Sequence, residues 1–113
     1  MKDLVRVFKA CSDETRIRIL DLLIERECCV CEVMQVLAIS QTRASRNLAQ
    51  LYDAGLLECR REGLWTIYYL APEIEGDFRD LLITAVKQAL SHDKQVATDL
   101  KSLRNRGRLC PVT

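Results

Sequence analysis

The first part of the chain has apolar residues spaced three to four positions apart, interrupted by short polar stretches. This period predicts three helices that each bury one face, over residues 3–10, 13–26 and about 31–38. Ser40 is suited to cap a fourth helix over about 40–54, because its hydroxyl can accept a hydrogen bond from a backbone N–H of the first turn. The first half of the chain is therefore predicted to form four short helices.

The period changes to two after Gly55, whose left-handed backbone can end the fourth helix. Apolar and polar residues then alternate over about 57–61 and 65–70, with Glu62-Gly63 as the turn between them. This alternation predicts a two-stranded hairpin over 57–70.

A last apolar pattern, with steps of four and three, runs from about residue 75 to 103 and is broken once, at Asp93. It predicts one long helix. The apolar positions of this helix are Leu82, Val86, Ala89, Val96, Leu100 and Leu103. A chain of this length has few other segments to cover such a seam, so we expect a partner subunit to cover it, with packing on the chain's own core as the alternative.

Composition fits one mostly helical domain over residues 1–113. Apolar residues make up 49% of the chain and charged residues 29%, and only two Pro and four Gly are present. No apolar run approaches the roughly 20 residues of a membrane span, and the N-terminal residues do not have the pattern of a secretory signal. We therefore expect a cytoplasmic protein with reduced thiols and no membrane partner.

Positive charge is concentrated in two segments, although the net charge is only +1. Residues 40–61 carry four Arg against two acidic residues, and residues 101–113 carry four basic residues and no acid. Clusters of this kind are suited to contact with phosphates, and a solvated surface is the alternative.

Three of the six cysteines, Cys28, Cys29 and Cys31, lie within four residues. A buried thiol often acts only as a small apolar side chain, but three crowded thiols are more typical of a soft-metal or redox site. Cys29 and Cys31 lie where the third helix is predicted to begin, and the helix dipole favours thiolates there. On a regular helix the two would point about 200° apart, so a shared ion requires a distorted first turn.

Four segments, in the same order, resemble the ArsR/SmtB family of bacterial metalloregulatory repressors. Residues 10–20 (ACSDETRIRIL) are similar to the family's opening LSDPTRLRIL, and residues 27–33 (ECCVCEV) to its metal-binding box ELCVCDL. Residues 40–51 (SQTRASRNLAQL) resemble its recognition helix SQxxxSxHLxxL, and residues 55–70 resemble its wing. The resemblance implies a winged helix-turn-helix, mainly α with a small β-hairpin, that dimerises through its N- and C-terminal helices.

The resemblance further implies a repressor that binds double-stranded operator DNA. The recognition helix over about 40–54 would enter the major groove, and wing arginines would contact phosphates or the minor groove. The expected DNA-binding residues are Ser40, Gln41, Thr42, Arg43, Ser45, Arg46, Arg60 and Arg61. Asn47 stands where the family usually has a His. A phosphate contact from the basic tail over 104–113 is a further hypothesis.

The CVC sequence resembles the arsenite-responsive branch, which implies As(III) or Sb(III) as the inducer. Cys29 and Cys31 are the expected ligands, with Cys28 or Cys110 as a third. Met34 stands where that branch often has another Cys, and a thioether is a weaker ligand than a thiolate. We expect ion binding to pull on the helix beside the recognition helix and to release the DNA.

Three alternatives stay open. A repressor of the same fold could respond to Cd(II), Pb(II) or thiol oxidation. Cys28-x-x-Cys31 also matches a dithiol oxidoreductase, although the preceding helix is not the βαβ context of that class and His92 is the one His for acid–base chemistry. The third alternative is a winged helix that binds a protein instead of DNA. We expect a regulator and no enzyme.

Overall fold

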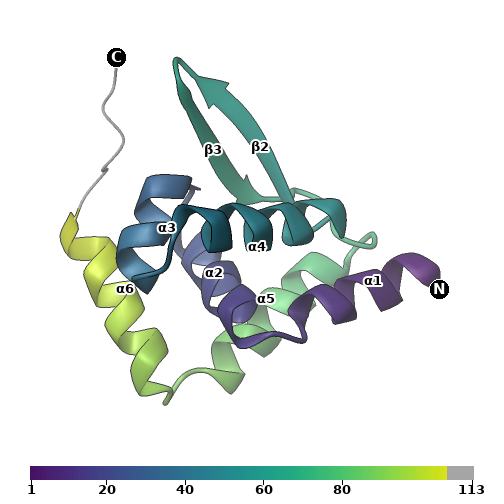
Figure 1. Ribbon diagram of the computed structural model, residues 1–113. Coiled ribbons are helices and arrows are strands. Elements are labelled where there is room, and N and C mark those ends of the chain that lie inside the picture. Colours follow the sequence, from purple (N-terminus) through teal and green to yellow (C-terminus); the bar gives the residue numbers. More distant parts are fainter. Residues whose placement is uncertain (107–113) are drawn as a thin grey trace.

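Six helices and three short strands make up residues 1–106, which are the residues that the computed structural model describes (Figure 1). The helices are α1 (Lys2–Cys11), α2 (Glu14–Glu25), α3 (Val30–Leu37), α4 (Gln41–Asp53), α5 (Phe78–Ala89) and α6 (Lys94–Arg106). The strands are β1 (Cys28–Cys29), β2 (Leu57–Glu62) and β3 (Trp65–Leu70). The chain is mainly helical, as expected, but its sheet has three strands where the sequence predicts two. Among these residues, no helix has the length and apolar character needed to cross a membrane.

The polar residues between the helices act as local caps. The Asp13 carboxylate accepts a hydrogen bond from the backbone N–H of Arg16 (3.0 Å) and starts α2. Ser40 caps α4 in the same way, through the backbone N–H of Arg43 (3.1 Å). Gly55, with a φ of 84°, turns the chain from α4 towards β2, and a residue with a Cβ would be strained there.

The core is built around α2, which packs against α4, α6 and β3 (Figure 1). Ile19, Leu20 and Leu22 of α2 are completely buried, and so are Leu48 and Leu51 on the inner face of α4. Burial of each such side chain contributes roughly 1.5–3 kcal/mol to folding. This packing fixes the orientation of α4 and leaves its outer face at the surface.

The sheet is antiparallel, with the strand order β1-β3-β2. The β2–β3 hairpin projects away from the helices as a wing (Figure 1). The two residues of β1 pair with the other edge of β3, with Cys28 opposite Tyr68 and Cys29 opposite Ile67. A strand of two residues is too short to produce an alternating pattern, which is why the sequence does not predict it.

The prediction of one helix over 75–103 is wrong, because the structure has two helices there, with a turn over 90–93 between them. The Asp93 carboxylate accepts a hydrogen bond from the backbone N–H of Val96 (3.0 Å) and caps α6. The residue that breaks the apolar pattern therefore starts a new helix. Most of the predicted seam is covered by the chain's own core. Its buried members are Leu82, Val86, Val96 and Leu103.

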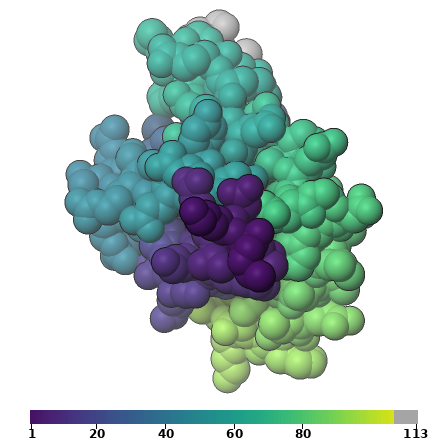
Figure 2. Space-filling model, turned by 90° about the vertical axis from the view of Figure 1, so that its right-hand side faces the viewer, coloured from purple at the N-terminus to yellow at the C-terminus, as the bar shows by residue number. Residues whose placement is uncertain are grey.

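A different apolar surface lies where α1 meets α5. Val5 and Phe8 of α1 and Leu81 of α5 are 41%, 53% and 67% exposed. The ring of Phe8 packs edge to face against Phe78, with centroids 6.0 Å apart. Figure 2 shows α1 (purple) on this side of the molecule, beside the green segment that contains α5. We call these four residues the α1–α5 surface, and exposed apolar side chains gathered in this way are typical of an interaction surface.

Candidate DNA-binding surface and thiol site

α4 exposes the polar side chains that the sequence predicts for DNA contact. Its inner face is buried through Ala44, Leu48 and Leu51. The exposed residues at and after its N-cap are Ser40, Gln41, Thr42, Arg43, Ser45 and Arg46. They lie in the N-terminal half of the helix, the part that reaches base edges when a helix of this motif lies in a major groove.

Some polar side chains of α4 also fix it to α2. Nη2 of Arg43 donates to Oγ1 of Thr15 (3.2 Å). Oδ1 of the half-buried Asn47 accepts from Nη1 of Arg16 (3.3 Å), and its Nδ2 donates to the backbone oxygen of Arg43 (2.9 Å). Asn47 therefore serves the contact between α2 and α4 in this structure.

The two wing arginines have different surroundings. Arg61 is exposed. Arg60 forms two hydrogen bonds with Glu27, from Nη1 to Oε2 (2.8 Å) and from Nη2 to Oε1 (2.7 Å). Its guanidinium carbon also lies 5.6 Å from the centre of the Tyr69 ring. Arg60 is thus held against the segment that leads into β1, whereas Arg61 is exposed on the wing.

The strand β1 sends neighbouring cysteines to opposite faces of the sheet. Cys28 is buried in the main core, which the helices share. Cys29 packs against Ile67, and Cys31 and Trp65 pack against this pair. The structure therefore brings Cys29 and Cys31 to one face and places Cys28 on the other.

The start of α3 explains why Cys29 and Cys31 can share a face. Cys29 is the N-cap of α3 and has an extended backbone (φ −88°, ψ 169°), so the regular helix begins one residue later. The expected 200° separation does not apply, and no distorted turn is required. The backbone N–H of Cys29 donates to Oε1 of Glu32 (3.0 Å), and Oε2 of this buried carboxylate forms an ion pair with Nη2 of Arg26 (2.8 Å).

The thiols of the site are in different chemical states. Burial raises the pKa of the Cys28 thiol to about 12, and the Glu32 carboxylate acts in the same direction. A thiol must lose its proton to bind a metal ion, so the raised pKa makes Cys28 a weaker candidate ligand. The free thiols of residues 1–106 are Cys11, Cys28, Cys31 and Cys59. Cys29 is disulfide-bonded, so it must be reduced before it can bind an ion.

Among residues 1–106, no third protein ligand is found beside this pair of cysteines. Within residues 1–106, no three His, Cys, Asp or Glu side chains are grouped to hold a metal ion. Met34 packs against the main core. Cys110, the other candidate, and the basic segment after residue 106 lie outside the described residues.

Comparison with known proteins identifies the class of regulator. A model of the family described as "Bacterial regulatory protein, arsR family" matches residues 13–58, from the cap of α2 to the start of the wing. The cadmium resistance transcriptional regulatory protein CadC homolog of Staphylococcus aureus is 36% identical over 97 residues, which cover 85% of this chain and 74% of that protein. The chain belongs to the ArsR family. This family is one of transcriptional regulators and not of enzymes.

Other ArsR-family proteins are similar in sequence and in fold. The arsenic resistance transcriptional regulator ArsR1 of Pseudomonas putida is 51% identical over 70 residues, which cover 60% of this chain and 54% of that regulator. A homodimeric winged helix-turn-helix DNA-binding domain from Mycobacterium bovis, of a possible ArsR-family regulator, is 32% identical. It superposes with a TM-score of 0.68 over 82% of each chain. The winged helix-turn-helix expected from the resemblance is confirmed.

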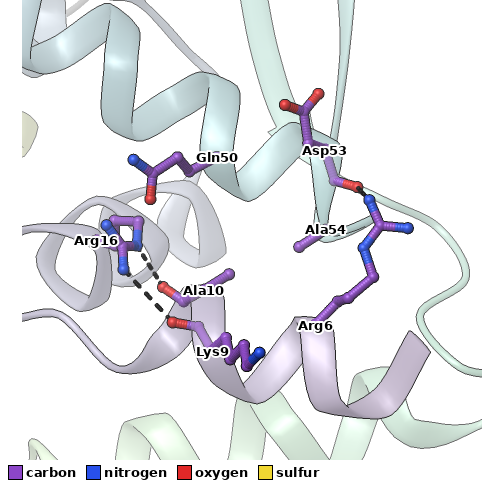
Figure 3. A pocket seen from close by; sticks show the side chains of 7 residues that line it. All are labelled: Arg6, Lys9, Ala10, Arg16, Gln50, Asp53 and Ala54. Carbon is purple, nitrogen blue, oxygen red and sulfur yellow. Dashed lines mark hydrogen bonds between the residues drawn. The ribbon is translucent and has the colours of Figure 1, made fainter. Parts of the chain in front are cut away.

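A pocket of this ArsR-family chain lies where α1 packs against α2 and the recognition helix α4 (Figure 3). Nε of Arg16 donates to the carbonyl oxygen of Ala10 (2.6 Å), in the last turn of α1. Nη2 of Arg6 donates to the carbonyl oxygen of Asp53 (3.2 Å), at the end of α4. The remaining lining residues are Lys9, Gln50 and Ala54. Both guanidinium groups donate hydrogen bonds to carbonyl oxygens in the last turns of helices. We therefore interpret the pocket as part of the structural contact between α1, α2 and α4, and not as a ligand site.

Three charged residues of the ArsR-family thiol site are missed by the sequence analysis: Arg26, Glu27 and Glu32. The spacing from Cys29 to Glu32 is that of a capping box, and this signal could have indicated the role of Glu32. The pair of Glu27 and Arg60 joins residues 33 positions apart. No local pattern indicates such a contact, since it depends on β1 pairing with the wing.

Proposed function

We propose that this ArsR-family regulator is a repressor that binds operator DNA as a homodimer and leaves the DNA when As(III) or Sb(III) binds Cys29 and Cys31. The observation that carries the proposal is the common location of these two side chains, which pack with Ile67 and Trp65 where α3 meets the wing sheet. An ion held there would contact both the wing sheet and the helix that packs against α4.

The exposed face of α4 supplies the groups that read DNA. Gln41 has the two-sided amide that pairs with adenine, and Arg46 is suited to guanine or to a phosphate. Arg61 on the wing is suited to a phosphate contact beside the groove. Ser40 and Arg43 reach the same groove while they also hold the helix in place.

The α1–α5 surface supports a homodimer. Its exposed Phe8 and Leu81 have the apolar character of an interface core. The related domain from Mycobacterium bovis is homodimeric. A two-fold axis through this surface would present two copies of α4 to half-sites about one helical turn apart, roughly 34 Å.

The donor set decides the class of inducer. Two thiolates and no histidine favour a thiophilic ion over a hard cation. Cys28 faces the core and is protonated, and Met34 packs in that core, so neither is suited to complete the coordination. The third ligand of the ion is then an external thiol or hydroxide, or Cys110.

Cadmium is a second candidate inducer. It is favoured by the similarity to the Staphylococcus aureus cadmium resistance regulator, which covers more of this chain than the match to the arsenic resistance regulator does. Both readings use the same thiols and the same fold.

The test is a titration of DNA binding in the presence of a reductant, which keeps Cys29 in its thiol form. Fluorescence anisotropy with DNA from the protein's own promoter is measured while arsenite, antimonite, Cd(II) and Pb(II) are added separately. Release by arsenite or antimonite at low concentration supports the proposal. Release by Cd(II) or Pb(II) alone would change the inducer, and release by none of them would refute it.

Two variants identify the ligands. Cys29→Ser and Cys31→Ser should each abolish the arsenite response while the free protein still binds DNA. Cys59→Ser is the matched control, because Cys59 is an exposed thiol of the same sheet outside the pair. If the control loses the response as well, the assignment of the ligands is wrong.

A further inference from the structure

The thiol site is also part of the wing. Cys29 pairs with Ile67 in β3, and Ile67 pairs with Arg60 in β2 on its other side. The three residues form one row across the sheet, with side chains on the same face. A shift of Cys29 therefore reaches the wing directly, without passing through α3 and α4.

The Glu27–Arg60 ion pair spans this row. Glu27 lies two residues before Cys29, so its side chain points to the same face, and it meets Arg60 from the far strand with two hydrogen bonds of 2.8 and 2.7 Å. The Tyr69 ring lies next to the guanidinium. The pair thus connects the segment before β1 with β2, across the central strand β3.

A paired contact of this type depends on alignment. Two parallel N–H to O bonds form only while the planes of guanidinium and carboxylate stay matched. An ion that draws Cys29 towards Cys31 displaces β1 and with it Glu27, and this displacement breaks the alignment. Arg60 and the hairpin that carries it then lose this contact with the segment before β1, while the pairing of β1 with β3 remains.

We propose that Glu27 and Arg60 are positioning residues that make the orientation of the wing depend on the state of the cysteine pair. This inference rests on the proposed function, because it names how ion binding at the cysteines reaches the DNA-binding surface. Neither residue binds the ion. A simple phosphate contact by Arg60 is the competing explanation, and the two differ in what the variants do to the arsenite response.

The experiment measures the DNA dissociation constant of Glu27→Gln, Arg60→Gln and the double variant, with and without arsenite. The readout is the ratio of the two constants, which reports coupling between the sites. Glu25→Gln is the matched control, since it makes the same change of charge at another ion pair, Glu25–Arg104, between α2 and α6. Each single variant should reduce the ratio about threefold or more, the double variant should match the singles, and the control should keep the wild-type ratio.

An unchanged ratio in both single variants overturns the inference, even if Arg60→Gln weakens DNA binding in both states, which is the result a phosphate contact predicts. A second arm separates this failure from failure of the proposed function. Hydrogen exchange of the protein without ion should become faster in β1 and the wing together in Glu27→Gln and stay unchanged in the control. If arsenite does not change DNA binding by the wild-type protein, the proposed function fails. If Glu27→Gln exchanges hydrogen in β1 and the wing at the same rate as the wild type, the connection between β1 and the wing is rejected.

Discussion

The two ends of α2 hold the molecule together by different means. In its N-terminal half, α2 packs on the recognition helix within the main core, where Ile19 and Leu48 are completely buried. Arg16 donates a hydrogen bond to Asn47 of α4, and Thr15 accepts one from Arg43 of α4. The C-terminal end, beyond the buried Leu22 and Leu23, leads into the thiol site, where two ion pairs connect the chain.

Those charged connections differ from the apolar contact in how they respond to movement. Arg26 pairs with the buried Glu32, and Glu27 pairs with Arg60 at the surface. Apolar packing has no directional requirement, whereas ion pairs need matched geometry. The recognition helix therefore rests on a stable platform, and the thiol site is the region whose contacts rearrange most easily.

The largest effect is expected when an apolar side chain between α2 and the recognition helix is removed. This change tests the contrast between the two ends of α2. Leu48→Ala should lower the free energy of unfolding by about 2–5 kcal/mol, because it leaves a cavity between α2 and α4. Urea denaturation measures this change. Tyr52→Ala on the exposed side of α4 is the control, and an equal loss in both variants would show that the inner face is not special.

Removing the buried charge at the other end should cost less. Glu32→Gln retains an acceptor for the N–H of Cys29 but loses the ion pair with Arg26, so we expect a loss of about 1–3 kcal/mol in the same denaturation experiment. Glu25→Gln, which breaks an exposed pair, should change the free energy by less than about 1 kcal/mol. A loss for Glu32→Gln larger than that for Leu48→Ala would contradict the contrast between the two ends.

Measurements of DNA affinity distinguish residues that contact DNA from exposed residues elsewhere on the protein. Arg46→Ala should weaken operator binding about tenfold and, if Arg46 contacts a phosphate, reduce the slope of log affinity against log salt by about one. Anisotropy at several salt concentrations measures both quantities. Lys94→Ala, an exposed cation at the start of α6, should leave the affinity and the slope unchanged.

The smallest effect is expected at Cys28. A thiol with a pKa of about 12 stays protonated at neutral pH and is still mostly protonated at pH 9, and only the thiolate is nucleophilic. Iodoacetamide should therefore modify the exposed Cys59 long before the buried Cys28 in the native protein. Peptide mass spectrometry follows both sites, and labelling of Cys28 at the rate of Cys59 would show that the site opens.

Local signals in the sequence predict much of this fold, and long-range contacts account for what they miss. The caps at Asp13 and Ser40 and the alternating pattern of the wing depend on neighbouring residues, so they can be read directly. Asp93 was visible as a break in a helical pattern, but whether the chain turns there depends on the core that α6 finds.

The thiol site also has one feature that local sequence signals predict and others that depend on long-range contacts. Clustered cysteines indicate chemistry, but their faces depend on the pairing of β1 with a strand about 40 positions later. This pairing separates Cys28 from Cys29. It also brings Glu27 next to Arg60. The sequence predicts Arg60 as a DNA contact, but no local pattern indicates that it pairs with Glu27.

One consequence of the thiol site lies in its optical properties. Trp65 is the only tryptophan of the chain, and it packs against the cluster that contains Cys29 and Cys31. Sulfur atoms and heavy ions quench indole emission at short range. The intrinsic fluorescence of the unlabelled protein is therefore a one-site reporter, and it should follow oxidation, reduction and ion loading of this cysteine pair with no added dye and no DNA.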